Sequence, residues 1–447
     1  MKTLQRILVI WILGAVASMA LTGCGGLTST APVTVPGVAL HGTVHGGQEP
    51  IIGATLQLYA AGSTGYGSAY PYTSGTSLLG THVVQSDTNG GFNITGDYTC
   101  PSSTTEVYLV ATGGAPGPSS PTNSSIALMA ALGPCGLLSS STIVSINEIT
   151  TVASVWALSP FMTGIANIGT SSGNAQGLTN AFATVNKLAN ISTGSVSGPA
   201  LPAGATVPVA KMDTLADILA LCINSAGDTG SGTICDTLFN AATINSVKPA
   251  DTITAAMNLA QHPNMGTALA NMVNPSSQFQ PTLLAAPSDF SLVITYTGGG
   301  LSTPKGIATD SSGNVWAPNS GNNSVTKLDA QGITLTDTTG FLSGAGGYTV
   351  GSLSAPAAIA IDLSGNAWVA NSGNNSMTEL NSSGSFGTVF SGGGLNSPSS
   401  IAVDASNNIW ITNNGNSSVT QISNTGTLTN FTGAGITTPT AIAINPK

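Results

Sequence analysis

The sequence predicts a multidomain protein with an N-terminal β-sandwich, a central all-α domain and a C-terminal β-propeller that is partial or small, with about four blades. Three observations lead to this prediction. Residues 37–138 alternate apolar and polar residues between glycine-rich turns, residues 139–288 are rich in alanine and leucine at helical spacing, and residues 289–447 repeat one pattern. With 447 residues, 41% of them hydrophobic, the chain is long enough for about three domains.

The repeated pattern has the period of a four-stranded propeller blade, about 40 to 50 residues. Each copy opens with a proline, and these prolines lie 52, 42 and 41 residues apart: Pro304, Pro356, Pro398 and Pro439. Three tryptophans keep the first two intervals, and we expect them in the core of the repeats: Trp316, Trp368 and Trp410. The longer first interval contains FLSGAGGYTV, which we interpret as a lengthened outer loop.

The pattern P-x-x-I-A-x-D-x-x-G-N-x-W-x-x-N, complete around Pro356, resembles NHL-type propeller repeats and the related virginiamycin B lyase-like propellers. The lyase resemblance implies a histidine, an acidic partner and a divalent metal. No histidine follows His262 in this chain, so we do not carry the lyase chemistry over. We expect no catalytic residue, no metal and no cofactor.

Two arrangements of the repeats remain open. The segment DFSLVITYTGGG before Leu301 and the trailing TAIAINPK could form one composite blade that closes a small ring. Alternatively, the propeller is open and a second copy of the chain completes it, because unpaired sheet edges favour association.

The first residues predict export. Residues 1–23 have two basic residues and a short apolar run, as in a signal peptide, and residues 24–36 form a linker. The string LTGC resembles a bacterial lipobox, which implies that Cys24 carries lipid and anchors the mature chain in the cell envelope, at the cell surface or in the periplasm. The alternative is an ordinary secretory signal.

The composition excludes one class of partner. Only 6% of residues are charged, the net charge is −9, and the single arginine is Arg6. Nucleic-acid binding requires clustered lysine and arginine, so we expect no nucleic acid partner. A neutral polysaccharide or an envelope protein suits this polar, weakly charged chain better.

Four cysteines besides Cys24 predict disulfides in an oxidising compartment. Three pairings are possible, and we favour Cys222 with Cys235 and Cys100 with Cys135, by proximity in the sequence. A four-cysteine metal site is the competing interpretation, although no CxxC pair is present.

The predicted sandwich resembles carboxypeptidase-regulatory-like, transthyretin-like domains in the spelling P-I-I-G-A-x-L-x-L-Y followed by T-N-G-x-F-x-I. That resemblance implies a spacer or a weak binding module. His41 and His45 lie about 13 Å apart if they share one strand, too far to hold one ion, so we interpret them as surface histidines.

The central region contains helices with apolar faces, such as the face of Met212, Leu215, Leu219 and Cys222. Pro249 with Asp251 should open a helix that ends before Pro263. Two pairs of polar residues could be imagined as supplying acid–base carboxylates, but we interpret them as structural and Asp217 as solvated: Asn147 with Glu148, and Asp213 with Asp217.

Two further sets of residues recur in the repeats. We expect three aspartates to accept hydrogen bonds within their own turns: Asp310, Asp362 and Asp404. Three asparagines close the tryptophan strands and could line a polar ligand face: Asn319, Asn371 and Asn413.

These observations predict a lipid-anchored, exported, non-catalytic binding or scaffold protein whose propeller face binds a neutral polysaccharide or a protein. One alternative is an extracellular propeller enzyme of lyase or hydrolase type. Another is a truncated relic of a longer propeller protein.

Overall fold

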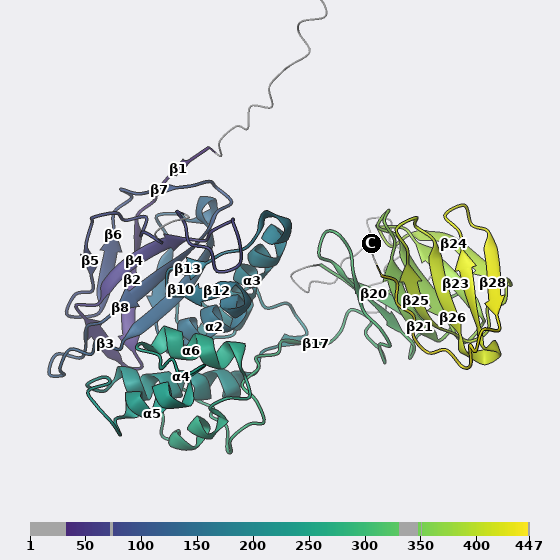
Figure 1. The fold of residues 1–447 in the computed structure, drawn as a ribbon. Coiled ribbons are helices and arrows are strands. Elements are labelled where there is room, and N and C mark those ends of the chain that lie inside the picture. The colour runs from purple at the N-terminus through teal and green to yellow at the C-terminus, as the bar shows by residue number, and fades with distance from the viewer. Residues whose placement is uncertain (1–32, 72–74, 330–346, 350, 446–447) are drawn as a thin grey trace, which may run out of the picture.

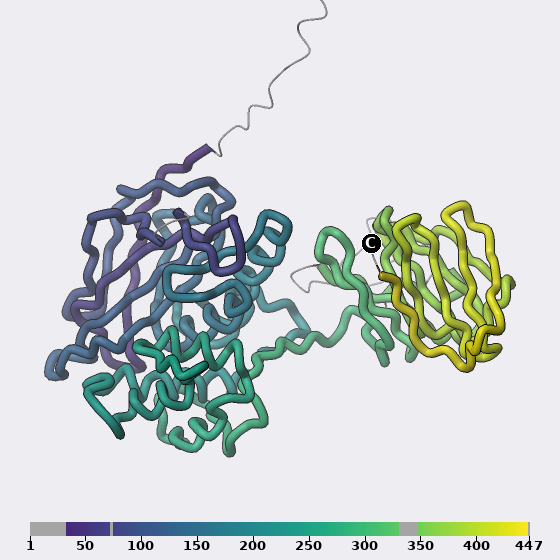
Figure 2. The backbone as a smooth tube through the Cα atoms, viewed as in Figure 1, coloured from purple at the N-terminus to yellow at the C-terminus, as the bar shows by residue number. Residues whose placement is uncertain are grey.

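The computed structural model describes residues 33–71, 75–329, 347–349 and 351–445. Figure 1 shows two bodies, one that ends near β17 (Thr295–Tyr296) and one made of the sheets that follow. The tube in Figure 2 crosses between them in the region of β17. The predicted Cys24, the signal segment 1–23 and most of the linker 24–36 lie outside the described residues, as does most of FLSGAGGYTV.

The N-terminal body contains two main sheets. One has the strand order β10-β8-β4-β5, and the other has the order β11-β2-β3-β9 with β6 paired to β2. Strand β11 runs parallel to β2, whereas the other pairs in these two sheets are antiparallel. The strands are β1 (Val35–Pro36), β2 (Leu40–Gly46), β3 (Glu49–Ile52), β4 (Thr55–Ala60), β5 (Val84–Gln85), β6 (Gly91–Ile94), β7 (Thr99–Cys100), β8 (Glu106–Thr112), β9 (Ala115–Pro116), β10 (Ala127–Pro134) and β11 (Ile143–Ile146).

Helices and short strands follow in the same body. The α-helices are α2 (Glu148–Leu158), α3 (Ala175–Leu188), α4 (Val209–Ile223), α5 (Ile234–Ala241) and α6 (Thr252–Gln261). The 3₁₀ helices are η1 (Cys135–Leu137), η2 (Ser159–Phe161), η3 (Ser172–Asn174) and η4 (Thr267–Met272). The short strands are β12 (Met162–Gly164), β13 (Asn167–Ile168), β14 (Ala189–Asn190), β15 (Ser195–Val196) and β16 (Ala205–Thr206).

Capping side chains fix where several of these helices begin. The side chain of Asn147 accepts a hydrogen bond from the backbone N–H of Thr150 at 3.0 Å, and the hydroxyl of Thr150 accepts one from the backbone N–H of Asn147 at 2.9 Å, which completes a capping box for α2. Asp251 accepts from the backbone of Thr254 at 2.8 Å and caps α6, the helix start that the sequence predicted there.

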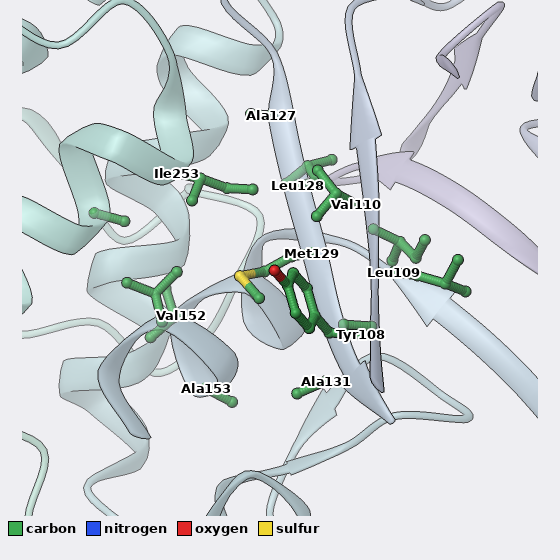
Figure 3. Close-up of a cluster of buried hydrophobic side chains, with 14 of the residues drawn as sticks. Tyr108, Leu109, Val110, Ala127, Leu128, Met129, Ala131, Val152, Ala153 and Ile253 are labelled. Carbon is green, nitrogen blue, oxygen red and sulfur yellow. The ribbon is translucent and has the colours of Figure 1, made fainter. Parts of the chain in front are cut away.

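The predicted boundary between a sandwich at 37–138 and a helical domain at 139–288 does not separate two hydrophobic cores. A single cluster of buried side chains runs from Leu40 to Phe290 and includes both sheets and all five α-helices. Figure 3 shows this contact, with Met129 and Tyr108 of the sheet facing Val152 of α2.

Hydroxyl side chains explain why the sheet and the helices cannot be separated. The edge strand β10 directs backbone N–H groups at the helices, where the hydroxyls of Thr151 and Ser154 accept from Met129 and Ala131 at 2.9 and 3.0 Å. Thr252 of α6 accepts from Ala127 at 3.0 Å and donates back to its carbonyl. An exposed edge strand invites aggregation, so these helices complete the sheet.

The C-terminal body is a series of antiparallel sheets. The first has the order β18-β19-β20, the second β21-β22-β23-β24 and the third β25-β26-β27-β28. Their strands are β18 (Ala308–Thr309), β19 (Val315–Asn319), β20 (Ser324–Leu328), β21 (Pro356–Ile361), β22 (Ala367–Asn371), β23 (Ser376–Leu380), β24 (Phe386–Ser391), β25 (Pro398–Val403), β26 (Ile409–Asn413), β27 (Ser418–Ile422) and β28 (Leu428–Thr432), and the 3₁₀ helix η5 (Asn414–Asn416) joins β26 to β27.

The composite blade, one of the two arrangements left open by the sequence, does not form among the described residues. The leading strand, β17, pairs with β16 of the N-terminal body, where Tyr296 lies opposite Ala205 and Thr295 opposite Thr206. The hydroxyl of Thr297 adds a bond to the carbonyl of Gly204. The N-terminal body therefore takes up the strand that was expected to close a small ring.

Candidate functional sites

The repeated aspartates stabilise their own turns, as the sequence predicted. One carboxylate oxygen of Asp362 accepts from the backbone N–H groups of Ser364 and Asn366, at 2.8 and 2.9 Å. The other accepts from the Asn366 amide and from the Trp368 indole, at 3.1 and 3.0 Å. Asp310 and Asp404 make the same four bonds in their sheets.

These bonds also set the charge of the aspartates. Burial alone would raise the pKa of Asp404, but the hydrogen bonds from Trp410, Asn408 and Ser406 hold it below its ordinary value. The pKa of Asp310 is lowered in the same way against burial. The carboxylates of Asp310 and Asp404 are thus held in the ionised form by the hydrogen bonds that they accept.

The prediction of a ligand face at Asn319, Asn371 and Asn413 is wrong. Each side chain is 0% exposed. The amide of Asn371 donates to the hydroxyls of Ser376 and Thr378, at 3.2 and 2.9 Å, and its oxygen accepts from the backbone of Ser354. The asparagines of the first and third sheets do the same. A buried polar group requires partners, and the neighbouring strand supplies them.

The tryptophans pack between successive sheets, as expected for repeat core residues. The exposure of each tryptophan and its aromatic neighbour rises from the first sheet to the third. Trp316 stacks on Tyr348 and is 0% exposed, because the second sheet covers the pair. Trp368 packs beside Phe390 under the third sheet. Trp410 stacks on Phe431, and there the pair is partly exposed, with Phe431 at 41%.

The trailing residues lie beyond the third sheet in the place of a next innermost strand. The backbone of Ala355 donates to Asn323 of the preceding repeat, and that of Ser397 donates to Asn375. At the equivalent position after the third sheet, the backbone of Thr438 donates to the hydroxyl of Ser417 at 3.1 Å. Residues 436–445 therefore start a further repeat and leave the Trp410–Phe431 pair uncovered on the middle and outer strands.

The first sheet has an apolar face turned the other way. In the second sheet, the residues that cover Trp316 and Tyr348 are Leu353, Ile359, Ala367, Val369 and Leu380. The residues at the same repeat positions in the first sheet are Leu301, Ile307, Val315, Ala317 and Leu328. Ile307 is 71% exposed. The series of sheets thus has an aromatic face at one end and an aliphatic face at the other.

A cavity of about 600 Å³ opens in the N-terminal body beside β2, β15 and α4. Its lining is mainly neutral and polar, and its single carboxylate is that of Asp213. The lining residues are Thr43, His45, Gly47, Gln48, Ser145, Asn147, Ile149, Thr193, Gly194, Ser195, Val196, Val209, Asp213, Gln278, Phe279 and Gln280.

Buried carboxyl groups stand at and behind this cavity. Asp213 is 4% exposed, and burial together with the neighbouring Asp217 raises its pKa to about 7. Burial raises the pKa of Glu148 to about 8, against a hydrogen bond from the backbone of Gly47 at 3.0 Å. Burial also raises the pKa of Asp217 to about 6. The sequence interpretation of Asp217 as solvated is wrong, because its side chain accepts from the backbone of Phe279 inside the core.

Several polar atoms in this region have no hydrogen-bond partner among the described residues: Glu148 Oε1, Asp217 Oδ2, and both Nδ2 and Oδ1 of Asn224. The described residues contain no group of three or more histidine, cysteine, aspartate or glutamate side chains placed to hold a metal ion. A signal for the cluster was present in the sequence, since Asp213 and Asp217 interrupt an otherwise apolar helix one turn apart.

The cysteines form two disulfides, Cys100–Cys135 and Cys222–Cys235, which are the pairs that the sequence favoured. Such bonds indicate a non-cytoplasmic environment. In the part of the chain that the structure describes, no helix is long and apolar enough to cross a membrane. On β2, His41 is exposed and His45 lines the cavity, so the two histidines do not share a site.

Comparison with known proteins identifies the repeat. Residues 395–422, which make up most of the third sheet, match the NHL repeat family model. No curated protein matches the chain. The repeat assignment therefore agrees with the pattern first seen around Pro356.

Several solved structures align with about a third of the chain. A streptogramin B lyase is 18% identical over 32% of this chain and 43% of its own, with a TM-score of 0.26. Virginiamycin B lyase from Staphylococcus aureus is 18% identical over 35% and 50%, with a TM-score of 0.28. A nidogen/laminin complex is 19% identical over 33% and 55%, with a TM-score of 0.27. The chain spans about half the length of the structures that it matches.

Proposed function

We propose that this protein is an exported, non-catalytic binding and scaffold module whose C-terminal sheets assemble with a protein partner. The observation that carries the proposal is the Trp410–Phe431 pair. The equivalent pairs in the first and second sheets are covered by the next sheet, whereas Phe431 is 41% exposed. Burying aromatic surface of this kind is a main source of affinity at protein interfaces.

The partner that fits best is a second copy of this chain. The face that covers a tryptophan pair inside the protein is built from the aliphatic positions of the following sheet, and the first sheet presents the same positions, with Ile307 exposed. Two copies joined head to tail would bring two sets of three sheets into one ring. Six blades fall within the usual four to eight of propellers.

The inner strands of such a dimer must exchange. Residues 436–445 already lie in the innermost position beyond the third sheet, and β18 of the first sheet is only two residues long. The trailing segment therefore serves as the innermost strand for the partner's first sheet, in place of β18.

The buried asparagines remove the basis for a polysaccharide site on the tryptophan strands, so a protein partner is favoured over a neutral glycan there. The histidines are His41, His45, His82 and His262, all outside the repeats, which supports a non-catalytic role for the sheets.

Light scattering of the soluble chain that begins at Gly25 tests the assembly. We expect twice the chain mass, and a return to the monomer mass in Phe431→Asp and in Ile307→Asp. Phe386→Asp is the matched control, since Phe386 is 50% exposed on β24 of the middle sheet, away from both ends. A monomer at every concentration up to the solubility limit, or dissociation by the control alone, would refute the assembly.

We also propose that Cys24 carries the lipid that anchors the mature chain in the cell envelope. Two acyl chains bind a membrane stably, because each buried methylene contributes about 0.8 kcal/mol. In a bacterial host, labelled fatty acid should enter the parent protein and not Cys24→Ala, and the variant should leave the membrane fraction. Equal labelling of both proteins would refute the anchor.

A further inference from the structure

The cavity in the N-terminal body contains one charged side chain that lacks a counter-charge. Asp213 is the only carboxylate in the lining, it is 4% exposed, and the described residues make no hydrogen bond or ion pair to it. A buried ionisable group without a partner is costly for a fold, and such groups concentrate at binding sites.

The groups around Asp213 do not compensate its negative charge, and some of them add negative charge of their own. Asp217 lies one turn further along α4 and repels the charge of Asp213, and Glu148 of α2 stands behind Asp217. The histidine of β2 that lines the cavity is His45, and burial lowers its pKa against the effect of the nearby Glu49. The ammonium of Lys211 in α4 points to Asp289, at 3.4 Å, and so does not neutralise the cluster. A ligand with a positive charge would supply what these carboxyl groups lack.

The remainder of the lining offers neutral hydrogen-bonding groups. The side chains of Thr43, Gln48, Ser145 and Gln278 make no hydrogen bonds to other described residues, so their hydroxyl and amide groups are available to a ligand. Phe279 adds an apolar surface. A volume of about 600 Å³ lies within the range of small-molecule sites, roughly 300 to 1,000 Å³.

We propose that this cavity binds a small polyhydroxylated amine of the size of a hexosamine, with its ammonium group on Asp213 and its hydroxyls on the neutral side chains. The single carboxylate matches the single positive charge of such a ligand, and the surrounding amide and hydroxyl side chains match the hydroxyls of its sugar ring. This site lies outside the repeats and does not depend on the proposed assembly.

Calorimetric titration at neutral pH with three related sugars tests the proposal. Glucosamine carries the ammonium, glucose has a hydroxyl in its place, and N-acetylglucosamine has a neutral amide. We expect glucosamine to bind the soluble chain at least about tenfold more tightly than either neutral sugar, as a charge-assisted bond would provide. Equal affinities for all three sugars, or no binding of glucosamine, would overturn the proposal.

Two variants and a control locate the binding. Asp213→Asn keeps the shape of the side chain and should abolish the preference for glucosamine. Asp97→Asn removes the same charge at an exposed position and should bind as the parent does. Gln278→Ala should weaken all three sugars and keep the preference, which provides a second readout if Asp213→Asn folds poorly. A preference that survives Asp213→Asn, or affinities that Gln278→Ala leaves unchanged, would assign the binding to another site.

Discussion

The repeated aspartates of the C-terminal sheets and the carboxyl groups beside the N-terminal cavity have opposite environments. In the C-terminal sheets, the carboxylate of Asp362 accepts four hydrogen bonds, and its equivalents Asp310 and Asp404 have lowered pKa values. In the N-terminal body, Asp213 has no hydrogen-bond or ion-pair partner among the described residues, and burial, with a further contribution from Asp217, raises its pKa to about 7. Partners, rather than burial alone, decide whether a carboxylate stabilises the fold.

The difference follows from how each body is built. A repeat brings its own donors, because the turn amides, the asparagine and the tryptophan are always the same few residues away from the aspartate. Asp213 and Asp217 share α4, but Glu148 comes close to them only because α2 packs beside α4 in a single core. In the repeats these aspartates find their partners locally, whereas beside the cavity of the N-terminal body some carboxyl oxygens have no partner among the described residues.

The largest effect should come from Glu148, whose folded-state pKa of about 8 lies above the ordinary 4.5. The folded protein then holds the proton more tightly than the unfolded chain, so the stabilising contribution is complete below about 4.5 and is lost as the pH rises through about 8. Glu148→Gln should remove this loss, worth roughly 5 kcal/mol at most.

Urea unfolding at pH 5, 7 and 9 measures the effect. The variant should gain stability relative to the parent as the pH rises, while Asp97→Asn, at an exposed position, should follow the parent at each pH. A constant difference between Glu148→Gln and the parent across this range would mean that Glu148 does not titrate inside the fold.

The next effect concerns the buried asparagines. Asn371→Ala should destabilise the C-terminal sheets by about 3 kcal/mol, since it removes three buried hydrogen bonds. Unfolding followed by tryptophan fluorescence reports chiefly on these sheets, which hold Trp316, Trp368 and Trp410. Asn424→Ala, at an exposed asparagine bonded to Ser406, should cost less than about 0.5 kcal/mol. Equal costs would show that burial does not distinguish the two asparagines.

The smallest expected effect on stability distinguishes the first C-terminal sheet from the third. Replacing Trp316 or Trp410 by Phe removes the same indole bond to an aspartate. In the Ile307→Asp background, which the proposed assembly leaves monomeric, Trp316→Phe should cost about 2 kcal/mol because Trp316 is fully buried, and Trp410→Phe about 1 kcal/mol because its surface is partly exposed. The same fluorescence-monitored unfolding measures both variants. In that background, a larger cost for Trp410→Phe than for Trp316→Phe would show that the Trp410 face is covered without the assembly.

Local sequence was sufficient for some features. The disulfide pairs lie 35 and 13 residues apart along the chain, and proximity predicted both. The turns at Asp310, Asp362 and Asp404 depend on residues within six positions, so the repeat pattern predicted their role. The cap of α6 at Asp251 is equally local.

Other predictions failed. The asparagines were expected on a ligand face, but they are buried, and their accepting hydroxyls lie five and seven residues later on the neighbouring strand. In two further cases the deciding contact was distant in the sequence. The leading strand was assigned to the propeller, but its partner is Ala205–Thr206, about 90 residues earlier. The sandwich boundary failed because Thr151, Ser154 and Thr252 satisfy the edge of β10 from helices that follow it.

By itself, the sequence determined the repeated unit, its turns and the start of α6, because these depend on residues a few positions apart, and it favoured the observed pairing of the cysteines among three possibilities. Only the tertiary structure decided which polar side chains are buried with partners and which without. Burial and partnership are set by packing between elements far apart in the chain, as with Glu148 against Gly47 of the β2–β3 turn. For the same reason, only the structure revealed the Asp213 cavity and the uncovered aromatic face at Trp410 and Phe431.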